Sequence, residues 1–240
     1  MCTVTYIPKA DNTFILTSNR DEAVGRIALA PSFYTIEGVK MLFPKDAVAG
    51  GSWIGISDRN RLICLLNGGF ESHMRVDTYR MSRGVVLKEL LKAEDVFTAI
   101  EAFDFSNIEP FTIIAIDWNF HMRAIELVWD GKKRHITPLD DSPRIWSSSM
   151  LYDAKMKAKR QVWFAEFAKT TNWEAEELLS FHTTAGDGDA VVDVRMDRGF
   201  LKTVSTTQVE KTIDYCSMTY HDFQKGEVHQ TTFDLVNFEV

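Results

Sequence analysis

Cysteine, proline and glycine are scarce in this chain, and their scarcity narrows the fold. The 240 residues include three cysteines, six prolines and 13 glycines. An odd number of cysteines cannot pair completely within one molecule, and a chain of this length can bury its own core, so disulfides are not the stabilising device. The sequence also lacks internal repeats, low-complexity tracts and Pro- or Ser-rich linkers. We therefore expect one domain over residues 1–240.

An excess of basic residues and long apolar runs are missing too. Lys and Arg number 27 against 34 Asp and Glu, a net charge of −7, which argues against nucleic-acid binding as the main activity. No apolar run reaches the roughly 20 residues that cross a bilayer, so no integral membrane segment is expected. The N-terminus lacks the features of a signal sequence, and together with the odd cysteine count this predicts a cytoplasmic protein.

The spacing of apolar residues along the chain predicts its strands and helices. Apolar alternation, short apolar runs and turn clusters predict strands, and apolar residues at helical spacing predict two pairs of helices. Strands grouped in antiparallel pairs with helical pairs between them predict an α+β fold, a four-layer αββα sandwich of two antiparallel sheets. The expected strands are 2–7, 13–18, 53–56, 62–66, 111–117, 122–129, 134–137, 203–210 and 213–220, and the expected helices are 79–91, 93–103, 151–168 and 173–181.

Cys2 is the first candidate for chemistry. If Met1 is removed, Cys2 carries both a thiol, with an ordinary pKa of about 8.5, and a free α-amine, with a pKa of about 7.7–8.0. Nucleophile and base then belong to one residue, which suits acyl transfer. The alternative is a small side chain that merely packs in a first strand.

Five consecutive polar residues, 18–22, end the second expected strand. They are typical of a solvated turn, in which Arg20 pairs with Asp21 or Glu22. If the first two strands form a hairpin, however, the end of the second lies near the start of the first. Asp21 or Arg20 then comes within reach of Cys2, where a carboxylate can hold an α-ammonium group or orient the thiol.

Asn67, Gly68 and Gly69 follow the apolar strand 62–66. Two glycines allow a tight turn and a close approach to a ligand, and an Asn amide can donate to a developing oxyanion. Taken alone, an ordinary Asn-Gly turn explains the same residues.

Together these motifs resemble the NRDE family, also called the transport and Golgi organisation family. Residues 19–22 spell Asn-Arg-Asp-Glu, and the opening Met1-Cys2-Thr3-Val4-Thr5, the Gly-Gly-Ser-Trp-Ile-Gly block at 50–55 and the turn at 67–69 recur in the family's order. The resemblance is strong over residues 1–70 and thinner beyond. More distantly, the opening is similar to the N-terminal-nucleophile hydrolases of the choloylglycine hydrolase and penicillin V acylase group, whose αββα sandwich matches the expected layers.

The distant resemblance implies a set of site residues. Cys2 would be the nucleophile, Asp21 would hold its amine, and Asn67 would contribute to the oxyanion hole with help from a backbone N–H near Gly68. Asn19, in the name motif, would support the site.

The sequence departs from the hydrolases at three places. Those enzymes place Arg three residues before the Asp, whereas this chain has Ser18 there and carries Arg20 instead. A later Asn of the hydrolases matches Ser148 best. Their late arginine has two candidates here, Arg195 and Arg198, of which Arg198 is the one assigned to the site.

The remaining polar residues suggest no cofactor or metal. The six histidines show no ligand spacing, and the Gly-Asp-Gly-Asp segment at 186–189 lacks the spacing of a calcium loop. The basic run from Lys155 to Arg160 is expected on the solvated face of a helix. Cys64 and Cys216 lie in apolar strands and are expected to be inert thiols.

These residues favour one function and leave two alternatives. The leading hypothesis is a cysteine amidohydrolase or acyl-transfer enzyme acting on a small acyl or amide substrate. The first alternative is a non-catalytic carrier or trafficking protein, with the same pocket holding an apolar ligand such as a lipid or haem-like molecule, as the family's association with Golgi organisation implies. The second is an interaction module with no small-molecule site.

Overall fold

Residues 3–234 are described by a computed structural model with two antiparallel sheets. One sheet has the strand order β10-β1-β2-β11-β12-β13, and the other runs β3-β4-β5-β6-β7-β8-β9. The strands are β1 (Thr3–Lys9), β2 (Thr13–Ala23), β3 (Ala28–Ile36), β4 (Val39–Asp46), β5 (Ile54–Ser57), β6 (Arg61–Asn67), β7 (Phe111–Asp117), β8 (Arg123–Trp129), β9 (Arg134–Pro138), β10 (Arg144–Ser147), β11 (Leu201–Lys211), β12 (Tyr215–Asp222) and β13 (Glu227–Asp234). The helices are α1 (Arg83–Lys92), α2 (Val96–Ala102), α3 (Ala154–Phe167) and α4 (Ala175–Thr184).

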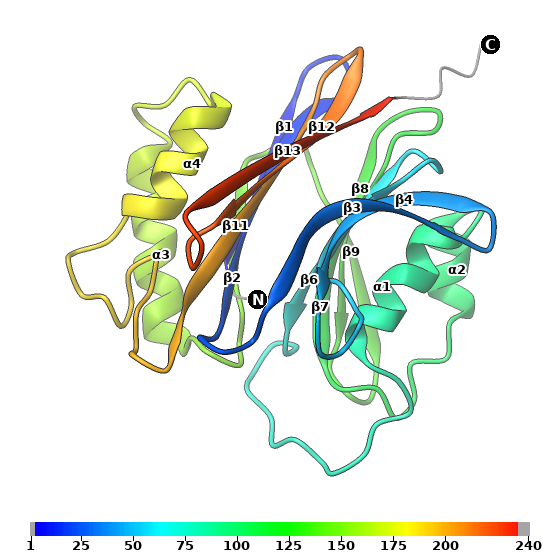
Figure 1. The fold of residues 1–240 in the computed structure, drawn as a ribbon, viewed down its shortest axis with the longest axis horizontal. Helices are drawn as coiled ribbons and strands as arrows, with labels where there is room; N and C mark the ends of the chain where they lie inside the picture. Colours follow the sequence, from blue (N-terminus) through cyan, green and yellow to red (C-terminus); the bar gives the residue numbers. More distant parts are fainter. Residues whose placement is uncertain (1–2, 235–240) are drawn as a thin grey trace.

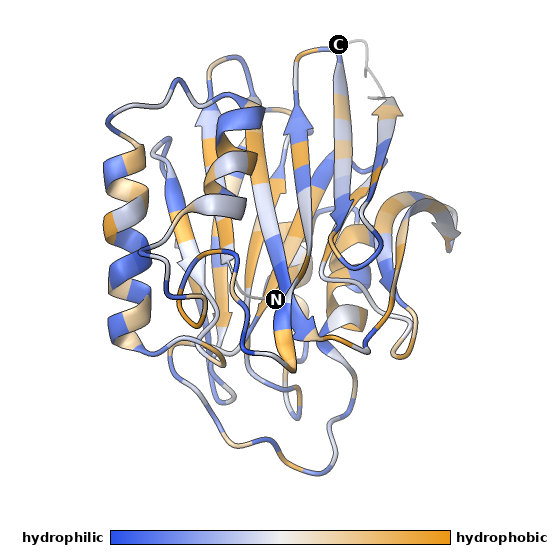
Figure 2. Cartoon of the chain, turned by 60° about the vertical axis from the view of Figure 1, so that its left-hand side comes forward, coloured by the Kyte–Doolittle hydropathy of each residue, from blue (hydrophilic) through white to orange (hydrophobic). Residues whose placement is uncertain are grey.

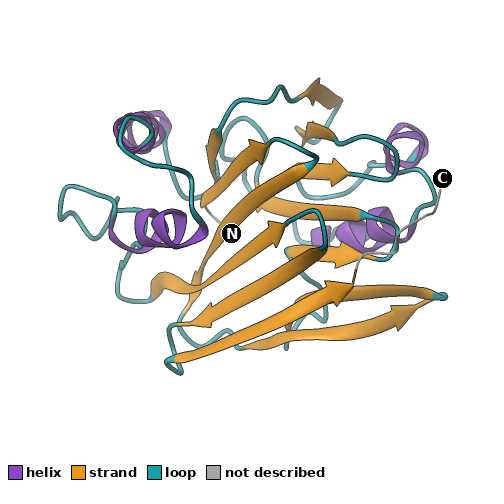
Figure 3. Cartoon of the chain, turned by 90° about the horizontal axis from the view of Figure 1, so that it is seen from above, coloured by secondary structure: helices purple, strands orange, loops and turns teal. Residues whose placement is uncertain are grey.

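The two sheets stack between two pairs of helices. In Figure 1, α3 and α4 cover the outer face of the sheet that contains β1 and β2, and α1 and α2 lie beyond the other sheet. Figure 3 shows the same order from above, with strands between two outer groups of helices. The αββα sandwich predicted from the sequence is confirmed.

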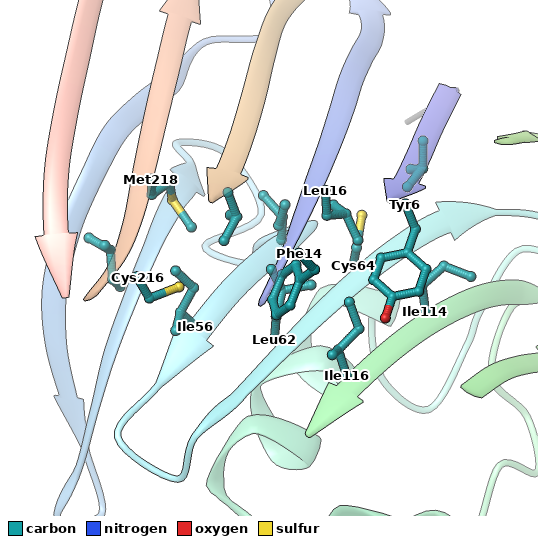
Figure 4. Packing of buried hydrophobic residues seen from close by; sticks show 14 of the residues in the cluster. Tyr6, Phe14, Leu16, Ile56, Leu62, Cys64, Ile114, Ile116, Cys216 and Met218 are labelled. Atoms are coloured by element: carbon teal, nitrogen blue, oxygen red, sulfur yellow. The ribbon is translucent and has the colours of Figure 1, made fainter. Parts of the chain in front are cut away.

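Three apolar layers hold the sandwich together. The layer between the sheets contains Phe14 and Leu16 from β2, Leu62 from β6 and Met218 from β12, which Figure 4 labels as members of one cluster. Separate clusters join α1 and α2 to one sheet and α3 and α4 to the other. Successive side chains of a strand point to opposite faces, so both sheets, buried on both sides, need apolar residues on both faces. Figure 2 shows the resulting orange segments along strands and helices.

Four strands were not anticipated from the sequence: β3, β4, β10 and β13. Three of them, β3, β10 and β13, form edges of their sheets. Edge strands are partly solvated and tolerate proline, so their apolar alternation is weak. Pro31 in β3 and Pro44 in β4 interrupt the pattern further.

Strand register sets the surroundings of the chain's first described residue. The predicted opening hairpin is confirmed, with Thr3 opposite Asn19 in β2. On its other side Thr3 pairs with Ser147 at the end of β10. The end of β2 and the segment that follows β10 therefore flank the start of β1. None of the helices among residues 3–234 has the length and apolar character needed to span a bilayer.

Candidate functional site

The Asn-Arg-Asp-Glu motif lies in β2, where strand alternation separates its side chains. Arg20 reaches across to the other sheet, where its Nη2 lies 2.9 Å from Oδ2 of Asp46 in β4. Asn19 and Asp21 contact the outer layer, which includes α4 and the segment before α3. The predicted pairing of Arg20 with Asp21 or Glu22 is wrong, because its carboxylate partner is Asp46.

Asp21 is buried and held by two hydroxyl groups. Only 3% of its surface is exposed. The Tyr152 hydroxyl donates to Oδ2 at 2.7 Å, and the Thr203 hydroxyl donates to Oδ1 at 2.5 Å. Thr203 lies opposite Asp21 in the β2–β11 pairing, so the strand register places its hydroxyl there. Both oxygens of the carboxylate are thus oriented.

Arg160 is a buried residue of α3 whose sequence pattern predicts exposure. It was expected on a solvated helix face, and this prediction is wrong, because Arg160 is 0% exposed. Its guanidinium donates to the backbone oxygens of Val192 and Asp193 and to the hydroxyl of Thr3. It also lies 3.5 Å from the centroid of the Tyr152 ring. The missed signal is the spacing of Arg160 from Phe164, since residues four apart share one face of a helix and both are buried.

The turn after β6 is held by two serine hydroxyls from the segment that follows β10. Ser148 donates to the backbone oxygen of Asn67, and Ser149 donates to that of Gly69, each at 2.6 Å. Gly68 has a φ of +88°, and a Cβ added there would lie 2.4 Å from the Ser149 hydroxyl. Glycine is therefore required at this position.

The backbone N–H of Gly68 is already committed. It donates to the backbone oxygen of Pro110 at 3.0 Å, so it does not point a free donor at a ligand. The side-chain amide of Asn67 differs, because within residues 3–234 it has no hydrogen-bond partner. It lines a cleft of about 470 Å³ together with Arg20 and Trp53. Asn67 is thus the better candidate for an oxyanion donor.

The segment 148–152 connects the two halves of the predicted site. Ser148 holds the Asn67 turn through its hydroxyl, and its backbone oxygen accepts from the backbone N–H of Tyr152 at 3.1 Å. Tyr152 in turn donates to Asp21. Arg198 supports the same segment, because it donates to the backbone oxygen of Leu151 at 3.0 Å, and its guanidinium lies 5.3 Å from the Tyr152 ring centroid.

Arg195 lies elsewhere. It is exposed, its guanidinium lies 4.2 Å from the ring centroid of Phe223, and it lines a different cleft from Asn67. Arg198 is thus the one of the two late arginines that supports the segment beside Asp21.

Asn19 has a full set of partners away from the cleft. Its Nδ2 donates to the backbone oxygens of His182 and Val194, while its Oδ1 accepts from Thr206 and faces Nδ1 of His182. Burial, and secondarily the charge of Arg160, lowers the pKa of His182 to about 3. The ring is therefore neutral, with Nδ1 donating to Asn19 and Nε2 accepting from Thr5. These contacts join β2 to α4 and give Asn19 a structural task.

Arg20 is fixed at the wall of the cleft. Besides Asp46, it donates to the backbone oxygen of Arg26, and its guanidinium lies 4.7 Å from the Trp53 ring centroid. Burial would raise the pKa of Asp46, but hydrogen bonds from Ala49 and Arg26 and the charges of both arginines leave that pKa below its usual value. The carboxylate is consequently ionised and holds both guanidinium groups.

Cys2, the predicted nucleophile, lies outside the described residues. The cysteines that are described, Cys64 and Cys216, are free thiols in the core, as expected. Burial raises the pKa of each to about 12, so neither is a reactive thiolate near neutral pH. Across residues 3–234, no group of three or more His, Cys, Asp or Glu side chains is arranged to hold a metal ion.

Comparison with known proteins decides the family. The family profile described as Transport and Golgi organisation 2 matches residues 1–214. This chain belongs to that family. The resemblance seen in the Asn-Arg-Asp-Glu motif is therefore confirmed. Comparison with curated proteins finds no match.

Solved structures of N-terminal-nucleophile hydrolases share the fold. A variant of the conjugated bile acid hydrolase from Clostridium perfringens is 11% identical, with a TM-score of 0.59 over 97% of this chain and 92% of that one. The Caenorhabditis elegans orthologue of N-acylethanolamine-hydrolyzing acid amidase is 14% identical, with a TM-score of 0.59 over 86% and 92% of the two chains. Penicillin V acylase from Agrobacterium tumefaciens is 9% identical, with a TM-score of 0.52 over 99% and 87%. At these identities the likeness shows the fold.

Proposed function

We propose that this family member is an N-terminal-nucleophile amidohydrolase, which cleaves a small amide with Cys2 after removal of Met1. The observation that carries the proposal is the bridge 148–152, which ties Asn67 of one sheet to Asp21 of the other. Thr3, to which Cys2 is bonded, starts the strand that lies between β2 and β10.

Each residue has one task in the proposed reaction. The Cys2 sulfur attacks the amide carbon, and the thiol proton passes to the free α-amine. Asn67 donates to the oxyanion through its side-chain amide, and Asp21 accepts from the α-ammonium group. The C–N bond then breaks, with the proton transferred to the leaving amine. Water hydrolyses the thioester, with the α-amine as base, and restores Cys2.

The carrier alternative receives less support. A lipid or haem-like ligand needs a predominantly apolar pocket. The cleft beside Asn67 is lined by four arginines and three acidic side chains among its 17 residues. The apolar part of such a ligand would remove these charged groups from water without hydrogen-bonding to them, which opposes binding.

A cytoplasmic location is part of the same proposal. The chain has an odd number of cysteines, and both described cysteines are free. Free buried thiols suit a reducing compartment. Fractionation of cells that express the untagged chain tests this, and recovery with secreted or organelle-enclosed proteins would contradict it.

Mass spectrometry of the intact protein tests the nucleophile. We expect a mass without Met1 and one acyl adduct after exposure to p-nitrophenyl acetate. Cys2→Ala should abolish the adduct, and the matched variant Cys64→Ala should retain it, because the Cys64 thiol is buried. A retained Met1, or an adduct unchanged by Cys2→Ala, would refute the proposal.

Two further variants test the supporting residues. Removing one oxyanion donor typically lowers kcat by about 10²–10³, so we expect this loss in Asn67→Ala on an amide that the native protein cleaves. Asp21→Asn should slow acylation of Cys2 and shift the pH dependence of its rate, because the neutral amide stabilises an α-ammonium group less. Unchanged rates in both variants would remove these residues from the site.

A further inference from the structure

The cleft beside Asn67 holds a surplus of positive charge in an acidic protein. Its lining includes four arginines and three acidic side chains, whereas the whole chain has a net charge of −7. Charges that line a concave surface act on a ligand more strongly than scattered surface charges, because the surrounding protein excludes solvent. The position of the surplus positive charge within the cleft therefore indicates which charge a ligand carries and where.

One wall of the cleft is electrically balanced. Arg20 and Arg26 both contact Oδ2 of Asp46, at 2.9 and 2.8 Å. Arg26 also lies 3.7 Å from Glu22. Two guanidinium groups thus face two carboxylates, and this wall offers no unmatched charge.

The other wall carries the surplus. Glu109 is buried and meets two guanidinium groups, with Arg83 at 3.1 Å from Oε2 and Arg75 at 3.1 Å from Oε1. Nε2 of His73 is 3.4 Å from the same carboxylate. Arg83 is mostly buried, whereas the Arg75 side chain is 69% exposed. Within residues 3–234, Arg75 pairs with no residue other than Glu109.

Arg75 belongs to the long connection between β6 and α1. This connection, residues 68–82, contains no helix or strand and loops out beyond the sheets in Figure 1. It directly follows Asn67, and its residues Arg75, Tyr79 and Met81 line the cleft. Long irregular connections in compact proteins are frequently binding loops. The connection places an exposed guanidinium in the same cleft as the proposed oxyanion donor.

We infer that the substrate is an amide whose acyl part ends in a carboxylate, and that Arg75 binds this carboxylate. The inference rests on the proposed function and names the substrate class of that site. A guanidinium is suited to a carboxylate because it can donate two parallel hydrogen bonds. An uncharged acyl chain would leave the surplus charge unmatched and partly desolvated.

A pair of isosteric amides tests the inference. Glutaryl-p-nitroanilide ends in a carboxylate, and 5-methylhexanoyl-p-nitroanilide ends in two methyl groups of similar shape. We expect kcat/KM to be about tenfold higher for the glutaryl compound, as one partly screened charge-assisted contact allows. Arg75→Gln should remove this preference. Arg80→Gln is the matched control, because Arg80 is an exposed arginine of the same connection that pairs with Asp104 and does not line the cleft.

A binding experiment tests the preference for a carboxylate independently of catalysis. Calorimetry on the Cys2→Ala protein compares glutaramate with 5-methylhexanamide, neither of which can be cleaved there. Hydrolysis of both anilides without a glutaryl preference overturns the inference and leaves the proposed function standing. No hydrolysis, but tighter binding of glutaramate that Arg75→Gln abolishes, supports carboxylate binding by Arg75 and refutes the hydrolase. Neither hydrolysis nor a binding preference overturns both.

Discussion

Replacing Arg160 by methionine should destabilise the protein strongly. Methionine has a similar length but no donors, so the change leaves the backbone oxygen of Val192, the partly buried one of Asp193 and the Thr3 hydroxyl without the guanidinium. Each buried acceptor left unpaired costs about 1–3 kcal/mol. Relief of the buried charge offsets part of this, because no carboxylate among residues 3–234 pairs with Arg160. We expect a net loss of about 3 kcal/mol or more in the free energy of unfolding.

Urea denaturation followed by tryptophan fluorescence measures this loss. With an m-value of about 3 kcal/mol/M, the midpoint should fall by about 1 M. Lys159→Met is the matched control on the same helix, because Lys159 is half exposed and its only ion pair in the described chain is with Asp187. Its effect should stay below about 1 kcal/mol, as for exposed ion pairs generally. Equal midpoints for the two variants would refute the assignment of Arg160 as a buried structural cation.

Two further changes probe the site's framework. Gly68→Ala should cost about 2 kcal/mol or more, because its Cβ would collide with the Ser149 hydroxyl and its φ is positive. Gly188→Ala, with a φ of +83° and open space around it, should cost about 1 kcal/mol, and equal unfolding energies would contradict the collision. Burial lowers the pKa of His182 from 6.5 to about 3, so below pH 6.5 the unfolded chain binds a proton that the folded protein does not. The free energy of unfolding therefore decreases as the pH is lowered. Between pH 7 and 4 this contributes a loss of about 3 kcal/mol, which His182→Gln should remove from the pH dependence of unfolding.

The sequence predicts those helices and strands in which the pattern of apolar residues matches the pattern of buried positions. The strand β7 spans 111–117, as expected, because all seven of its residues are buried and apolar side chains dominate it. The edge strands β3, β10 and β13 lacked such a pattern, since water solvates part of their surface. That the chain forms a single domain stays a prediction.

The candidate site was predictable only where neighbouring residues form a motif. Asp21 and Asn67 were found because each sits in a short polar segment at the end of an apolar strand. Tyr152 was missed because it contacts Asp21 from 131 positions away, and one sequence contains no signal for that distance. The burial of Arg160 is not predicted because a basic run indicates exposure, and two of its partners are backbone oxygens that any residue supplies.

The two-sided placement of the Asn-Arg-Asp-Glu motif makes a prediction about energetic coupling. Asn19 and Arg20 are adjacent in the chain, but Asn19 contacts His182 in α4, whereas Arg20 contacts Asp46 in the other sheet. Side chains that share no partner contribute independently to stability, so in a double-mutant cycle Asn19→Ala and Arg20→Gln should couple by less than about 0.5 kcal/mol. Arg20 and Asp46 form a direct ion pair. In a second cycle, Arg20→Gln and Asp46→Asn should therefore couple by about 1–3 kcal/mol. Strong coupling in the first cycle would mean that the two faces of β2 respond as one unit, which their separate contacts do not allow.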